Sequence, residues 1–151
     1  MHQVQSLRHR GRTSFHAGVA AEDIALRAYR ASGYRPVAQR WRGQGGEIDL
    51  IFKDGDGFVF VEVKKSRSFA AAALRISQRQ KARIFSAAEE FIGAQHLGLL
   101  THMRFDVALV DSTGHLQIVE TRFGTAEADN IRHCTWVFTR SFKRQLCEDL
   151  P

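Results

Sequence analysis

Two acidic residues and one lysine stand where a hairpin would bring them together: Asp49, Glu62 and Lys64. The flanking segments predict two strands, because 47–53 alternates with a period of two and 58–64 is rich in valine and phenylalanine. The D-G-D-G sequence between them predicts a tight turn. Two converging carboxylates suit Mg²⁺, which prefers oxygen ligands, and a neighbouring lysine could stabilise charge that develops on a phosphate.

The register of this hairpin decides whether the acids meet. Pairing Lys53 with Phe58 across the turn puts Asp49 opposite Glu62. Like charges directly opposite in a sheet are destabilising by roughly 0.2–1 kcal/mol. A divalent cation between the two carboxylates would turn this repulsion into attraction.

The same spacing also fits a surface hairpin without a metal site. The register places Glu47 opposite Lys64, so these two could form an ion pair while the other two acids are solvated. A three-residue loop would shift the register and separate the acids. The spacing alone leaves both interpretations open.

Two motifs around the hairpin resemble the YraN family of small bacterial proteins. They are G-G-E-I-D-L-I at 45–51 and F-V-E-V-K at 60–64. That family belongs to the nucleases with the motif PD-(D/E)xK, and it is similar to archaeal Holliday-junction resolvases. Here the motif is Asp49 followed by E-V-K at 62–64, with Ile48 at the position of the proline, which is not a ligand.

The resemblance implies a role for each charged residue of the motif. Asp49 and Glu62, with the carbonyl of Val63, would hold one or two Mg²⁺ or Mn²⁺ ions. Glu22, in the G-x-x-x-E sequence of the first predicted helix, would be a third acidic ligand, directly or through water. Lys64 would activate the water or stabilise the transition state.

Two further segments resemble the family. R-Q-K-A-R-I at 79–84 matches a segment whose glutamine lies near the active site, so Gln80 would position a phosphate or the attacking water. R-F-D at 104–106 also matches, and we expect Arg104 and Asp106 to be a structural ion pair or surface charges.

Charge is distributed unevenly along the chain. The 151 residues carry a formal net charge of +6, with a pI of about 9.9. Residues 1–46 hold eight Lys/Arg against two acids, and residues 64–83 hold seven Lys/Arg and no acid. Such clusters indicate a polyanionic partner, most simply nucleic acid. The expected phosphate contacts are Arg75, Arg79, Lys81 and Arg83.

Several other classes find no support in the sequence. No apolar run approaches the ~20 residues of a membrane span, and the basic N-terminus lacks the apolar core of a secretory signal, so we expect a cytoplasmic protein. The two cysteines and seven histidines show no zinc spacing. No phosphate-binding loop or G-x-S-x-G motif is present.

The order of elements predicts an α/β domain. A length of 151 residues and 44% hydrophobic content suit one globular domain. The resemblance implies a restriction-endonuclease-like mixed five-stranded sheet flanked by helices. We expect a disordered basic arm at 1–13, a nuclease-like domain at 14–123, and a C-terminal extension at 124–151 that forms an extra helix or is loose. Within the domain we expect a helix at 14–32, strands at 34–42, 47–53 and 58–64, a helix at 78–96, and strands at 103–111 and 115–121.

The leading hypothesis from the sequence is a metal-dependent phosphodiesterase, an endonuclease acting on DNA that is branched or damaged. The alternative is a non-catalytic nucleic-acid-binding module with the same fold, in which the acids are structural. Many relatives of this fold act as dimers, so the resemblance implies that a homodimer could form. The sequence itself has no interface signature.

A first prediction concerns the basic stretch. Binding to duplex DNA should weaken with salt, with a slope of about −0.9 for each phosphate neutralised. Replacing Arg75, Arg79 and Arg83 by glutamate should flatten that slope in a salt titration, because fewer counterions are released. An unchanged slope would place the binding surface elsewhere on the chain.

Overall fold

The structure is a computed structural model that describes residues 18–65, 77–98, 100–121 and 138–142. Its first helix is described over residues 18–31. The other elements are β1 (Arg35–Arg42), β2 (Glu47–Asp54), β3 (Gly57–Lys65), α3 (Gln78–Ala94), β4 (Met103–Val110), β5 (Leu116–Thr121) and β6 (Phe138–Phe142). The predicted order of helix, three strands, helix and two strands is confirmed. The predicted arm at 1–13 and most of the extension at 124–151 lie outside the described residues.

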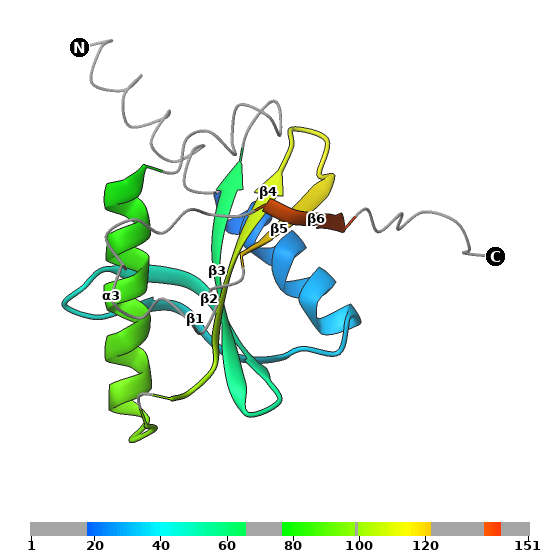
Figure 1. Ribbon diagram of the computed structural model, residues 1–151. Helices are drawn as coiled ribbons and strands as arrows, with labels where there is room; N and C mark the ends of the chain where they lie inside the picture. Colours follow the sequence, from blue (N-terminus) through cyan, green and yellow to red (C-terminus); the bar gives the residue numbers. More distant parts are fainter. Residues whose placement is uncertain (1–17, 66–76, 99, 122–137, 143–151) are drawn as a thin grey trace, which may run out of the picture.

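One mixed sheet organises the chain. Its strands follow the order β1-β2-β3-β4-β5-β6. Neighbours β3 and β4 are parallel, with α3 between them in the chain, and the other neighbours are antiparallel. The five predicted strands are present. The C-terminal extension adds β6, which pairs with β5 at the edge of the sheet (Figure 1).

The β2–β3 hairpin has the register that the sequence predicts. Asp54 pairs with Gly57 and Lys53 with Phe58, so the loop contains two residues, Gly55 and Asp56. Gly55 has φ of 55°, a conformation that glycine adopts without steric cost. The ammonium of Lys53 lies 4.2 Å from the ring centre of Phe58, a cation–π contact across the same pair. The three-residue loop that would have shifted the register is excluded.

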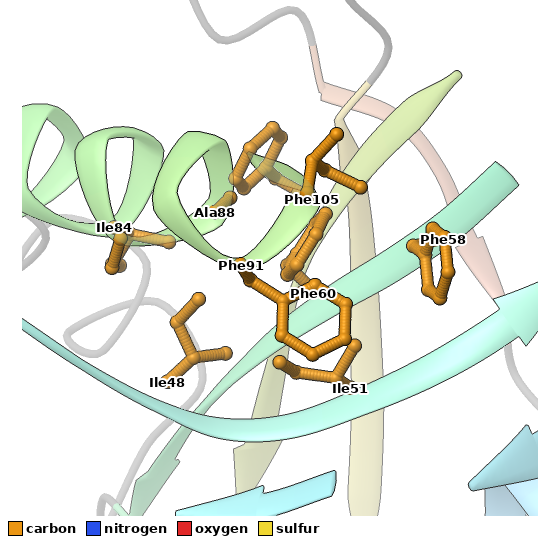
Figure 2. Close-up of a cluster of buried hydrophobic side chains, with 10 residues drawn as sticks. Ile48, Ile51, Phe58, Phe60, Ile84, Ala88, Phe91 and Phe105 are labelled. Carbon is orange, nitrogen blue, oxygen red and sulfur yellow. The ribbon is translucent and has the colours of Figure 1, made fainter. Parts of the chain in front are cut away.

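Helices cover both faces of the sheet (Figure 1). One core cluster includes Phe58 and Phe60 of β3 packed with Phe91 of α3 (Figure 2). A second cluster on the other face includes Val59 of β3 packed with Tyr29 of the first helix. Because side chains alternate along β3, its residues contribute to both cores, as expected for a sheet with helices on both faces.

Local signals explain where the helices end. The first helix stops before Gly33, whose φ is 91°, as the sequence predicts. Helix α3 ends at Ala94, two residues before the predicted end, because His96 has φ of 55° and cannot continue a right-handed helix. Among the described residues, no helix combines the length and the apolar character that a membrane crossing needs.

A buried polar network joins the first helix to β4. Asp106 is 1% exposed, and its carboxylate accepts two hydrogen bonds of 3.0 Å from Arg104 and one of 2.6 Å from the Tyr29 hydroxyl. Arg104 also donates to the Tyr34 hydroxyl at 3.1 Å. Of the two interpretations of R-F-D, the structural ion pair is confirmed. Its charges are satisfied inside the fold and are not available for chemistry.

The network predicts unequal costs for two similar substitutions. Asp106→Asn removes the buried carboxylate charge that Arg104 contacts through two hydrogen bonds, so urea unfolding should show a loss of about 3–5 kcal/mol. Asp54→Asn is the matched control, since Asp54 is 40% exposed and lies 3.5 Å from the same guanidinium. It should cost less than about 1 kcal/mol. Equal losses of stability in the two variants would contradict the assignment of Asp106 as the buried partner of Arg104.

Candidate functional site

Asp49 and Glu62 lie beside each other on the central strands. The β2–β3 pairing runs as far as Leu50 and Val61, and Asp49 and Glu62 are the next residues along the two strands. Beyond that point an Asp49 carboxylate oxygen (Oδ2) accepts a hydrogen bond of 2.7 Å from the Val63 amide. The predicted neighbourhood of the two acids is therefore present.

Both carboxylates line a pocket of about 230 Å³. Its walls also include the predicted residues Gln80 and Arg83 from the first turns of α3, together with Glu47 and Ile84. Ile84 belongs at the same time to the core cluster under α3 (Figure 2). The pocket thus lies where the start of α3 meets the ends of β2 and β3, with an apolar wall on one side.

Burial and a neighbouring charge make Asp49 unusual. Burial away from water is the largest cause, and the negative charge of Glu62 is the second. Together they raise the pKa of Asp49 from 3.8 to about 7. The Val63 amide and Lys64 oppose this shift, while Glu22 adds to it. A bound cation would reverse the balance, because it stabilises the charged form of both acids.

Lys64 lies beside Glu62, as their positions two apart on one strand predict. Its ammonium is 2.5 Å from a Glu62 carboxylate oxygen, with the two side chains 30% and 15% exposed. The alternative pairing of Glu47 with Lys64 is wrong. Glu47 instead accepts a hydrogen bond of 2.7 Å from Arg42, its pairing partner on β1.

Glu22 is near the site but does not line the pocket. Both of its carboxylate oxygens accept hydrogen bonds from Arg40, at 2.8 and 2.9 Å. Its charge nevertheless contributes to the raised pKa of Asp49. Within 18–65, 77–98, 100–121 and 138–142, no three His, Cys, Asp or Glu side chains form a group that could hold a metal ion. The carboxylates in the pocket wall are those of Glu47, Asp49 and Glu62.

Gln80 has a structural role at the start of α3 as well as a place in the pocket wall. Ser77 caps the helix by accepting from the Gln80 amide at 3.2 Å, and the Gln80 side chain accepts from the Ser77 amide at 3.3 Å. This capping box fixes the first turn of α3 against the pocket.

The predicted phosphate contacts are only partly described. Arg79 and Arg83 are exposed on α3, and Lys81 is half-buried between them. Arg75 lies outside the described residues. Among the described contacts, only Arg83 also lines the pocket.

Two residues that support the site were missed by sequence reasoning. Arg40 holds Glu22, although the two stand on separate elements. Glu90 of α3 accepts hydrogen bonds of 3.0 Å from the amides of Gln44 and Gly45, which lowers its pKa and holds the β1–β2 turn. A Cβ on Gly45 would lie 2.8 Å from the Ala87 amide nitrogen, so this turn needs glycine to approach α3. The G-Q-G-G sequence was the available signal for that approach.

The raised pKa of Asp49 predicts a pH-dependent stability. Between pH 3.8 and about 7 the folded chain keeps a proton that the unfolded chain has lost. Stability should therefore fall as pH rises through this window, by up to about 1.36 kcal/mol per pH unit, and then level off. Asp49→Asn removes the charge and should lack this fall in urea unfolding measured across the window.

The exposed turn residue Asp56 provides the control. Asp56→Asn should retain the wild-type decrease in stability, and added Mg²⁺ should reduce it in the wild type but not in Asp49→Asn. If stability changed with pH in the same way in all three proteins, the pKa of Asp49 would not be raised.

Comparison with known proteins places the chain in a family. Residues 21–110, which include Glu22, Asp49, Glu62, Lys64 and Gln80, match the uncharacterised protein family UPF0102. A UPF0102 protein of Roseobacter denitrificans is 56% identical over 120 residues, covering 80% of this chain and 93% of the relative. One of Ruegeria pomeroyi is 54% identical over 121 residues, covering 80% and 98%. The resemblance to YraN proteins is thus confirmed at the level of the family, and the chain belongs to UPF0102.

Proposed function

We propose that this protein is a metal-dependent phosphodiesterase that cleaves DNA. The observation that carries the proposal is the pair Asp49 and Glu62, two adjacent carboxylates in a pocket wall, with Lys64 against Glu62. A fully solvated acid would need no explanation. A partly buried pair of like charges that raises the pKa of Asp49 to about 7 is typical of a site arranged for a cation or for catalysis.

The residues present fit a hard divalent cation such as Mg²⁺ or Mn²⁺. Asp49 and Glu62 would bind it, with the carbonyl of Val63, whose amide already fixes the Asp49 carboxylate. Glu22 would act through water, because Arg40 occupies both of its oxygens. When bound, the ion would neutralise the acids and polarise a water molecule or a phosphate oxygen.

The remaining side chains have distinct roles in this proposal. Lys64 is held near the reacting phosphate by Glu62 and stabilises the negative charge that develops during attack. Gln80, fixed by the capping box, orients the phosphate or the water. Arg83 on the pocket wall, with Arg79 and Lys81, contacts flanking phosphates.

DNA is the proposed substrate for two reasons. The first turn of α3 contains no acidic residue, so its N-terminal dipole and its basic side chains both favour phosphate. The motifs also resemble PD-(D/E)xK nucleases and Holliday-junction resolvases, which makes branched or damaged DNA the first substrate to test. This second reason is an analogy from sequence motifs and fold.

A specific observation favours a second candidate, a non-catalytic nucleic-acid-binding module. Several acids around the site already have a basic partner: Arg40 for Glu22, Arg42 for Glu47 and Lys64 for Glu62. In this alternative the ion pairs are structural, and the basic residues of α3 hold nucleic acid without cleaving it.

Lys64 separates the two candidates. Lys64→Met keeps much of the stem but removes the ammonium, so single-turnover cleavage of a branched DNA with Mg²⁺ should fall by about 100- to 1,000-fold. Equilibrium binding to the same DNA should change little, because one phosphate contact among several contributes a small share of affinity.

Lys65→Met is the matched control, since Lys65 is the next residue and is exposed at the end of β3. It should cleave at nearly the wild-type rate. Full activity in Lys64→Met would remove Lys64 from the mechanism. A wild type that binds DNA but cleaves no linear, nicked, flap or four-way substrate with Mg²⁺ or Mn²⁺ would support the binding module.

A further inference from the structure

We propose that the guanidinium of Arg40 takes the place of a second metal ion, so that the site binds one divalent cation at Asp49 and Glu62 and not two. This inference rests on the proposed metal site and states how many ions it holds. It also gives Arg40 a positioning role: it holds Glu22 away from the bound ion.

The sheet register puts Arg40 in the row of the acids. On β1, Gln39 pairs with Leu50, so Arg40 occupies the register position opposite Asp49. Asp49 and Glu62 follow the last β2–β3 pair, and both line the pocket. Arg40 therefore lies on the β1 side of Asp49, and Glu62 lies on its β3 side.

Arg40 forms the kind of contact that a metal ion would otherwise make with Glu22. Its Nε and Nη2 atoms donate to the two Glu22 oxygens at 2.8 and 2.9 Å, the two-pronged geometry of a guanidinium on a carboxylate. The side chains are 35% and 18% exposed, so the pair is only partly screened by water. The charges of Glu47 and Asp49 also act on Arg40 and favour its cationic form.

The backbone at Arg40 is held in a conformation that arginine does not favour. Its φ is 49°, in the left-handed region, although the neighbours on β1 are paired with β2 on both sides. Glycine would adopt this φ at lower cost. The chain has an arginine there, and its side chain makes the bidentate contact with Glu22. Strained backbone that is maintained next to a polar cluster suggests a functional constraint.

The arrangement disfavours a second ion for two reasons. A two-metal site needs carboxylates that serve both ions about 3.5–4 Å apart. Glu22, whose charge acts on Asp49 from outside the pocket wall, is already bound to Arg40 through both oxygens. A second divalent ion on the Arg40 side of Asp49 would also be repelled by the guanidinium. One ion in the pocket, on the Glu62 side, meets neither obstacle.

Counting bound Mn²⁺ tests this inference without relying on activity. Electron paramagnetic resonance of free Mn²⁺, with titration calorimetry, gives the number of ions per chain at saturation. We expect one ion in the wild type and two in Arg40→Met, where Glu22 becomes available. The double variant Arg40→Met with Glu22→Gln should return to one.

Two further variants control for poor folding of Arg40→Met and for the general effect of removing one positive charge. Arg40→Gly removes the same guanidinium and suits the positive φ, so it should also bind two ions even if Arg40→Met is poorly folded. Arg35→Met removes one charge from an exposed position on the same strand and should keep a count of one.

The outcomes separate this inference from the proposed function. If the wild type binds one ion, Asp49→Asn abolishes it and both Arg40 variants still bind only one, the inference is wrong and the metal site stands. Two ions in the wild type also overturn it. If neither the wild type nor any Arg40 variant binds Mn²⁺, the proposed metal site fails and the inference fails with it.

Discussion

The register of the β2–β3 hairpin is the constraint on which the rest of the structure depends. A two-residue loop pairs Asp54 with Gly57 and carries the register to Leu50 and Val61. The same register directs Phe60 toward α3 and Val61 toward the first helix, and it places Asp49 beside Glu62. Because side chains alternate, a slip of one residue would turn the core side chains of one strand to the opposite faces and separate the two acids. Both cores and the candidate site therefore depend on this turn.

This protein has two charge clusters, a buried one at Asp106 and a partly buried one at Asp49, and their carboxylates differ in how many partners they have. Asp106 is surrounded by hydrogen-bond donors from Arg104 and Tyr29, so the network stabilises the fold and leaves no charge to use. Asp49 has one backbone amide and a neighbouring carboxylate, and its pKa is raised to about 7. A fold retains such a pair at a cost in stability, and a bound cation would offset that cost. Burial raises the pKa of Asp106 as well, but Asp106 is paired with Arg104 and Tyr29, whereas Asp49 faces a second carboxylate. This difference in partners is the physical reason to propose function at Asp49 and not at Asp106.

Local features were predictable from the sequence, whereas contacts between distant elements were not. The hairpin, its register and the Glu62–Lys64 neighbourhood follow from turn chemistry and alternation, which involve only nearby residues. The pairing of Glu22 with Arg40 depends on how the first helix packs and on the positive φ of Arg40, and no spacing rule reveals either.

Other features were also not predicted from the sequence. Glu90 holds the β1–β2 turn across 45 residues of sequence, a contact that only packing creates. Strand β6 (Phe138–Phe142) pairs with β5, whereas the extension was expected to form an extra helix or to be loose. This short segment carries no clear alternation that would have predicted a strand. Gln80 was predicted near the site from family resemblance, yet its capping box with Ser77 also followed from the S-x-x-Q spacing and was missed.

Proton release on Mn²⁺ binding would show whether Asp49 and Glu62 form one site for a divalent cation. Titration calorimetry in buffers of different ionisation enthalpy gives the protons released per bound ion. About one pH unit below the Asp49 pKa of about 7, we expect nearly one proton to be released per ion, and far fewer well above that pKa. Asp49→Asn should neither bind nor release. Equal Mn²⁺ binding by wild type and Asp49→Asn, without proton release in either, would show that Asp49 is not a ligand of the ion.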